Sequence, residues 1–305
     1  MKKPLQFIIL VLVLSQSHAF SQNISKDTKI TNPCSKYNKA VRGTLGTYAN
    51  PPRLEDGRID QKRLIAELKD IHANTYNWLI RNNYDDLEAL KLFLPLARKA
   101  KLKVWVTLLP PSEPPFSEPF MLDYEQWATQ LAKLSLVELN LVAWSIDDFA
   151  HNLKLFTPEY VEKFLGAACA VNPKFAFIPC CYFKQITPSF ATNYGHLLNG
   201  ILFPYRAESV GANLKDASQV ENEIDKIHEI FGFNIPIVLD IYASAHSTLG
   251  ASTPEYVKDV LIAGMKAADG VLIYCHQDPV KSQAKYQIIK EGFRHNSKLK
   301  RRVRN

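Results

Sequence analysis

Two adjacent carboxylates directly follow an apolar run in the middle of the chain. The run is 141–146, and the acids are Asp147 and Asp148. An apolar run of this length bounded by polar residues predicts a buried strand, and the helical pattern from Thr157 onward makes it the strand of a βα unit. Because α/β folds usually place their chemistry at the carboxyl ends of strands, these two acids are the first candidates for catalysis.

Two carboxyl groups this close can perform acid–base chemistry. They resist ionising together, so one pKa is expected to rise and supply an acid while the other group stays anionic. Side-chain alternation along the strand turns Ala143, Ser145 and Asp147 toward one face, which is the crowded axis if the strand belongs to a barrel. Asp148 then falls in the loop. A solvated acidic pair rarely ends an inner strand, which favours a functional role.

A regular alternation of strands and helices positions this pair. We expect strands at 41–49, 75–80, 103–109, 141–146, 174–183, 200–205, 235–242 and 270–274, and helices at 59–72, 85–101, 124–138, 157–171, 187–198, 217–231, from 253 onward, and 282–293. Eight such units predict an α/β protein with a single (βα)8 TIM barrel over 41–294. A doubly wound sheet is the alternative, but the first strand lacks the glycine-rich turn that usually follows it in that fold.

The two ends of the chain have compositions of their own. Residues 1–19 combine Lys2 and Lys3, a short apolar stretch and small residues before Ala19, which is typical of a secretory signal peptide cleaved after Ala19. Residues 20–40 form an expected extended leader, and 295–305 a basic tail. No other stretch is apolar and long enough to cross a bilayer, so we expect a secreted or periplasmic protein that is not integral to a membrane.

The net charge and the spacing of the cysteines limit the kinds of molecule or ion that the protein is expected to bind. The formal charge of +7 resides in the two lysines of the signal and five basic residues of the tail. The body is therefore balanced and lacks the basic stripe that a nucleic-acid partner requires. The five cysteines are an odd number, so at least one is unpaired in a monomer, and their spacing fits no common zinc pattern. No metal and no cofactor is implied.

The residues that end the strands meet at one rim if the fold is a barrel. They are mainly aromatic, acidic, amide-bearing and basic: Tyr48, Asn50, Trp78, Arg81, Asp147, Asp148, Tyr182, Tyr205, Arg206, Glu208, Asp240, Tyr242, Tyr274, His276 and Gln277. Aromatic faces stack on sugars while carboxylates and guanidinium groups bind hydroxyls, so this composition predicts a carbohydrate partner. The candidate sugar contacts are Tyr48, Trp78, Tyr182, Arg206, Tyr242 and His276, although any one rim tyrosine or His276 can equally be a packing residue.

The Asp147-Asp148 motif after the fourth strand, in a setting like Phe-Asp-Asp-Ile, resembles the family 84 glycoside hydrolases, the O-GlcNAcase-like β-N-acetylglucosaminidases. In that family the first aspartate orients and polarises the 2-acetamido group of the substrate, which is the nucleophile, and the second is the general acid/base. The resemblance implies that Asp147 is the polarising residue, that Asp148 is the acid/base, and that the substrate is an N-acetylhexosamine glycoside.

Two other interpretations stay open. In many retaining glycosidases the acid stands on strand four and the nucleophile on strand seven, which would be Asp148 and Asp240 here. Those enzymes mostly use glutamate at both places, and Asp240 can instead be a structural acid within its strand. A barrel that binds carbohydrate without turning it over is the non-enzymatic interpretation, because the fold alone does not fix an activity.

Overall fold

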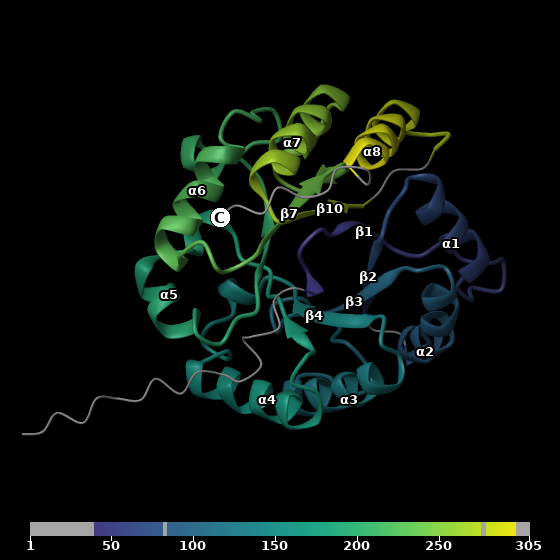
Figure 1. The fold of residues 1–305 in the computed structure, drawn as a ribbon, viewed down its shortest axis with the longest axis vertical. Helices are drawn as coiled ribbons and strands as arrows, with labels where there is room; N and C mark the ends of the chain where they lie inside the picture. Colours follow the sequence, from purple (N-terminus) through teal and green to yellow (C-terminus); the bar gives the residue numbers. More distant parts are fainter. Residues whose placement is uncertain (1–39, 82–83, 276–278, 297–305) are drawn as a thin grey trace, which may run out of the picture. The chain divides into compact units, whose positions relative to one another are not determined.

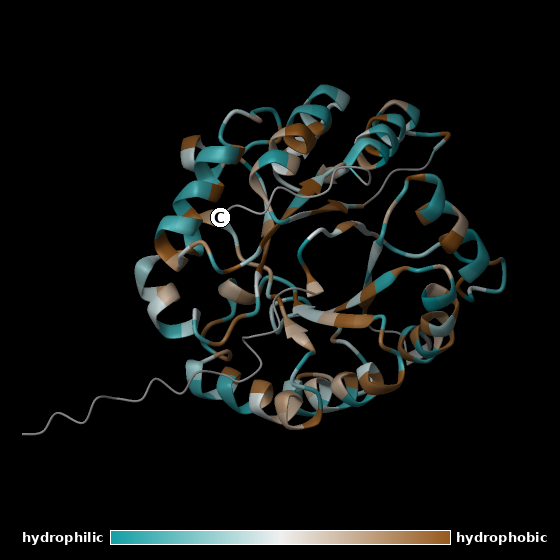
Figure 2. Ribbon diagram, viewed as in Figure 1, coloured by the Kyte–Doolittle hydropathy of each residue, from teal (hydrophilic) through white to brown (hydrophobic). Residues whose placement is uncertain are grey.

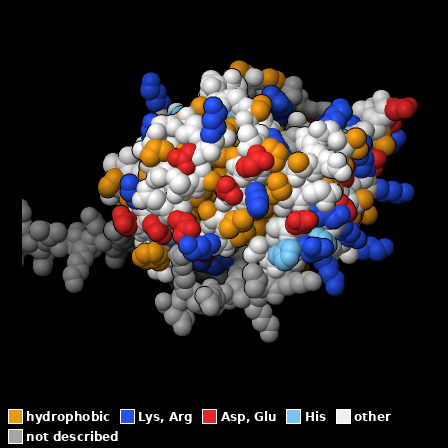
Figure 3. Space-filling model, turned by 90° about the horizontal axis from the view of Figure 1, so that it is seen from above, with side chains coloured by type: hydrophobic (Ala, Val, Ile, Leu, Met, Phe, Trp, Pro, Cys, Tyr) orange, Lys and Arg blue, Asp and Glu red, His pale blue; other side chains and the backbone are white. Residues whose placement is uncertain are grey.

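The computed structural model describes residues 40–81, 84–275 and 279–296. The expected signal peptide, the leader up to residue 39, most of the basic tail and the candidate His276 lie outside the described residues. Among the helices that are described, none has the length and hydropathy needed to span a membrane. Basic and acidic side chains are interspersed on the face of the molecule shown in Figure 3.

Eight parallel strands form one sheet: β1 (Leu45–Tyr48), β2 (Thr75–Ile80), β3 (Lys103–Leu108), β4 (Leu141–Ile146), β5 (Ala176–Phe177), β6 (Ile201–Pro204), β7 (Ile237–Tyr242) and β10 (Gly270–Tyr274). The segment after β5 pairs with β6, since Cys180 forms a parallel bridge with Leu202, and Leu202 donates its N–H to the Pro179 carbonyl at 3.0 Å. This contact joins the two edges of the sheet. The predicted (βα)8 barrel is therefore confirmed.

Helices follow the strands and surround them (Figure 1). They are α1 (Gln61–Asp70), α2 (Tyr84–Lys99), α3 (Tyr124–Val137), α4 (Pro158–Val171), α5 (Pro188–Tyr194), α6 (Val220–Phe231), α7 (Pro254–Ala267) and α8 (Gln283–Asn296). The strands that they enclose are mostly hydrophobic in Figure 2, and the helices carry both kinds of residue. Thr157, Thr187 and Thr253 cap α4, α5 and α7, each followed by proline at the first helical position.

The predicted and observed elements differ by a few residues at several ends, and three differences have a clear consequence or cause. The expected fifth strand, 174–183, is reduced to β5 and one bridge, because Pro179 has no N–H to donate to a sheet ladder. The expected first strand begins at Leu45, since Gly43 has a positive φ of 73° that ends extended structure on its N-terminal side. A short hairpin of β8 (Ala245–His246) and β9 (Gly250–Ala251) follows β7 and was not predicted.

Side-chain alternation separates an inner cluster from an outer one. Ala143 of β4 packs with Trp105, Val238 and Leu272 inside the barrel, while its neighbour Trp144 packs among the helices. The inner cluster is tight near β1. A Cβ atom on Gly46 would lie 2.5 Å from the Thr75 carbonyl oxygen and 2.7 Å from Leu272 Cδ2. Leu272 fills the interior only because residue 46 has no side chain.

Replacing Gly46 with alanine should therefore destabilise the barrel. We expect Gly46→Ala to lower the free energy of unfolding by about 1–3 kcal/mol, the usual cost of overpacking. The matched control is Gly166→Ala on α4, where a Cβ atom would meet nothing within 4 Å. This substitution should raise the free energy of unfolding by up to about 1 kcal/mol, because alanine favours a helix more than glycine does. Urea unfolding of the two variants measures both values, and equal effects would contradict the packing account.

Candidate active site

The chain turns sharply at the carboxyl end of β4. Asp147 still belongs to the sheet, because its N–H donates to the Leu108 carbonyl of β3 at 2.9 Å. Asp148 has a left-handed backbone (φ 43°, ψ 33°), which ends the extended segment and starts a 3-10 turn at Phe149–His151. The buried Phe149 anchors that turn in the core. The strand therefore positions Asp147, and the 3-10 turn that follows positions Asp148.

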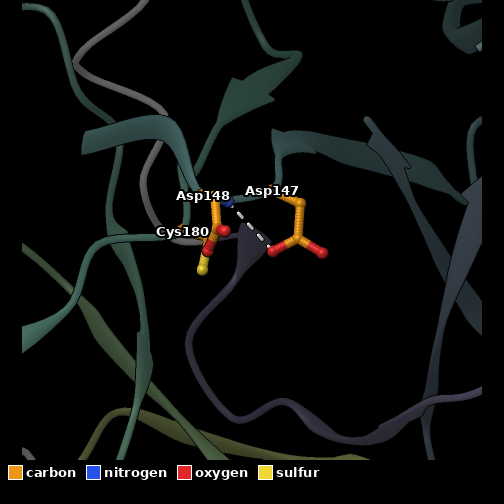
Figure 4. A group of neighbouring side chains, drawn as sticks. All are labelled: Asp147, Asp148 and Cys180. Atoms are coloured by element: carbon orange, nitrogen blue, oxygen red, sulfur yellow. Dashed lines mark hydrogen bonds between the residues drawn. The ribbon is translucent and has the colours of Figure 1, made fainter. Parts of the chain in front are cut away.

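Asp147 accepts hydrogen bonds from three donors. The Tyr48 hydroxyl donates to Oδ2 at 2.7 Å. The Asp148 N–H donates to Oδ1 at 3.1 Å (Figure 4), and the Cys180 thiol is the third donor. All three bonds favour the anion. Burial and then the negative charge of Asp148 oppose them and raise the pKa of Asp147 above its ordinary value. Asp147 thus keeps a proton to a higher pH than an exposed aspartate does.

Asp148 lies beside a histidine and a thiol. Its Oδ1 is 3.6 Å from Nδ1 of His151, and its side chain is 23% exposed. One atom each of Asp147, Asp148 and Cys180 lies within 4.8 Å of the others (Figure 4), and this is the only group of potential metal ligands in the described part of the chain. Burial raises the pKa of the Cys180 thiol well above its ordinary value. The neutral thiol donates a hydrogen bond to Asp147 and so belongs to the hydrogen-bond network of the carboxyl pair.

Four tyrosines at the rim lie near the carboxyl groups of the barrel, and we call Tyr48, Tyr182, Tyr242 and Tyr274 the tyrosine ring. The centroids of Tyr48 and Tyr274 are 5.4 Å apart, and those of Tyr242 and Tyr274 are 5.1 Å apart. Tyr182 forms a hydrogen bond with Tyr242. Burial is the main cause that raises the pKa of each hydroxyl. The ring therefore presents neutral phenols to the carboxyl pair.

An ion pair borders this ring after β6. The Arg206 guanidinium carbon lies 3.9 Å from the centroid of Tyr182, a cation–π contact, and Arg206 also forms an ion pair with Glu208. Glu208 is only 6% exposed and accepts the Lys184 N–H at 2.9 Å. Nη1 of Arg206 is 3.4 Å from Nε2 of His246. The arginine predicted as a sugar contact is thus fixed beside the ring.

Trp78 does not reach the rim, contrary to the prediction. It is 1% exposed and packs against Phe93 of α2, with ring centroids 5.2 Å apart. Its Nε1 donates to the Asp86 carbonyl at 3.0 Å. The physical reason is alternation, since the preceding Asn77 bonds the barrel residue Thr107 and so turns Trp78 toward the helices. A sugar contact through Trp78 is therefore wrong.

Asp240 lies inside the barrel, two residues before the end of β7. It is 3% exposed, and its Oδ1 has no hydrogen-bond partner. Burial and then the charge of Asp147 raise its pKa well above the ordinary value. Tyr242 occupies the strand end above it. A nucleophile must touch the substrate, so this depth argues against the retaining mechanism through Asp240.

Sequence reasoning missed Glu113 and His246. Glu113 stands in the proline-rich loop after β3, and burial, then the charges of Asp147 and Asp148, raise its pKa. The same loop contacts the β4 turn, where Asn152 Nδ2 donates to Ser112 Oγ at 3.0 Å. The periodicity of apolar residues predicts helices and strands, but it does not predict where a loop residue such as Glu113 lies in space. His246 lies in the hairpin that the sequence did not predict.

No known protein family matches the sequence, and no curated protein matches it. Solved structures do resemble the fold. A glucosidase from Croceicoccus marinus superposes with a TM-score of 0.61 at 10% identity, over 84% of this chain and 68% of its own. A GH5_18 protein from Streptomyces cattleya in complex with GlcNAc gives 0.62 at 10%, over 86% and 82%. The catalytic domain of an endoglucanase from Thermobifida fusca gives 0.57 at 11%, over 83% and 91%. These barrels are glycoside hydrolases, and at such identities the likeness establishes the shared fold.

The buried carboxyl of Asp240 should make stability depend on pH. Its folded pKa exceeds its unfolded pKa, so the native state binds more protons between the two values, and stability falls as the pH rises through that window. Asp240→Asn removes the titrating carboxyl group and with it this dependence of stability on pH. We expect the stability of the variant relative to wild type to grow with pH from about 4 upward, by at most about 1.4 kcal/mol per pH unit.

Urea unfolding at a series of pH values measures this difference. Asp225→Asn, the same substitution at an exposed position of α6, is the control for the chemical change itself. Parallel stability curves for Asp240→Asn and wild type would contradict a raised pKa of Asp240.

Proposed function

We propose that the protein is a glycoside hydrolase that cleaves a glycan at the carboxyl rim of the barrel, with Asp147 and Asp148 as its acid–base pair. One observation carries the proposal: Asp147, half-buried and with a raised pKa, lies next to the half-buried Asp148, and Tyr48 of the tyrosine ring donates a hydrogen bond to Asp147. Phenol faces and hydroxyls suit the faces and hydroxyls of sugars. The signal-like segment 1–19 supports an extracytoplasmic site of action.

Burial and the charge of Asp148 raise the pKa of Asp147, which favours a proton on Asp147 in the free protein. A substrate amide N–H that approaches Asp147 would stabilise its anion, because hydrogen bonds to the charged form lower a carboxyl pKa. Asp147 would then pass its proton to Asp148, which lies in the loop at the rim and is placed to donate it.

Substrate assistance fits these roles. The acetamido carbonyl oxygen of the sugar, polarised by Asp147, forms a bond to C1 while the bond from C1 to the leaving oxygen breaks. Asp148 gives its proton to that oxygen. It later takes a proton from the water that opens the cyclic intermediate, which restores the pair. The Streptomyces cattleya protein of similar fold is in complex with GlcNAc, which is a sugar of this kind.

Aryl glycosides with good and poor leaving groups test both roles. On a poor leaving group we expect Asp148→Asn to lower kcat/KM by about 10²–10⁴-fold, the usual contribution of a general acid. On dinitrophenyl N-acetylglucosaminides the loss should be much smaller, because that leaving group needs no proton. Asp147→Asn should lose activity on both substrates, since polarisation acts on the sugar. The exposed Asp259→Asn on α7 is the control and should keep full activity.

Two results would overturn this proposal. Full turnover by both Asp147→Asn and Asp148→Asn would contradict the proposed mechanism. A wild-type protein that binds glycosides of either anomer but hydrolyses none of them would instead assign the barrel to carbohydrate binding without catalysis.

A further inference from the structure

His246 is held in one tautomer by its own hairpin. Its Nδ1 lies 3.1 Å from the Thr248 N–H and 3.3 Å from the Leu249 N–H. Backbone N–H groups are donors only, so Nδ1 must accept, and the proton of the neutral ring resides on Nε2. Burial and then the charge of Arg206 lower the pKa of His246, which agrees with a neutral ring.

Nε2 of His246 and Nη1 of Arg206 are therefore two donors that face each other at 3.4 Å. Neither can accept from the other. Arg206 cannot turn away freely, because Glu208 holds its Nη2 and the Tyr182 ring lies under the guanidinium. Nε of Arg206 is buried without a partner. Two fixed donors at this separation are complementary to one oxygen acceptor of a ligand.

We propose that Arg206 and His246 form a two-donor site that binds an oxygen acceptor of an uncharged sugar, such as a hydroxyl or an acetamido carbonyl. This inference rests on the proposed function, because it assumes that a glycan occupies the rim. It adds a residue, His246, from an element that lies outside the strand ends. It also assigns Glu208 as the positioning residue that fixes Arg206.

The charges around the rim explain why the sugar is uncharged. Glu208 neutralises Arg206 in their ion pair. Glu113 lies close enough to Asp147 and Asp148 that their charges raise its pKa, with Arg81 as the cation that lowers it. Among these described residues, the four carboxyl groups of Glu113, Asp147, Asp148 and Glu208 outnumber the two guanidinium groups of Arg81 and Arg206. A uronic acid would add another negative charge, which like charges disfavour.

Two isosteric variants separate the roles of the two ring nitrogens. In His246→Asn the amide oxygen replaces Nδ1 as the acceptor in the turn, and the Nε2 donor is lost. In His246→Gln the amide nitrogen replaces the Nε2 donor, and the turn acceptor is lost. Binding of N-acetylglucosamine and of glucuronate is followed by NMR titration of each full-length variant and of wild type.

We expect wild type to bind N-acetylglucosamine more tightly than glucuronate, His246→Asn to lose at least about 10-fold in affinity, and His246→Gln to stay within about 3-fold. The ¹⁵N shifts of His246 should report a proton on Nε2. Three results would overturn the site: a greater loss of affinity in His246→Gln than in His246→Asn, equal affinity of wild type for the two sugars, or no binding of either sugar by wild type. Retained sugar binding without any hydrolysis would remove the proposed function and leave this site intact.

Discussion

The hydrogen bond between Tyr48 and Asp147 is the interaction on which the site depends. It joins β1 to the end of β4, 99 residues apart in sequence, and exists only because the sheet curls into a barrel. The bond orients one carboxylate oxygen, and the Asp148 N–H orients the other. Burial then raises the pKa of a carboxyl group whose position is fixed. A barrel that failed to close between Cys180 and Leu202 would lose the geometry that joins these groups.

The same barrel carries costs that packing must offset. Asp147 and Asp240 are carboxyl groups whose ionisation burial opposes, and Asn77 and Ser145 have buried polar atoms without partners. Such groups lower stability by roughly 1–3 kcal/mol each when unsatisfied. The layer of aromatic and aliphatic residues between strands and helices supplies the compensation.

Much of the fold could be predicted from the sequence, because apolar runs and threonine–proline caps are local signals. The ends of β2, β4 and β10 agree with the expected strands. The site was harder. Strand ends gave the predictions Tyr48, Tyr182, Arg206 and Tyr242. Trp78 was assigned to the wrong face of a correctly predicted strand, because its ring packs against the helices. His246 and Glu113 lie in loops, whose course depends on tertiary contacts that leave no periodic pattern in the sequence.

The most direct test of the central claim is a titration of the side-chain carboxyl groups of Asp147 and Asp148 by ¹³C NMR in the wild-type protein. The account predicts that Asp147 titrates above its ordinary value of 3.8, because burial and the charge of Asp148 oppose its ionisation. If Asp147 titrated at or below that value, its pKa would not be raised, and the proposed acid–base role would be contradicted.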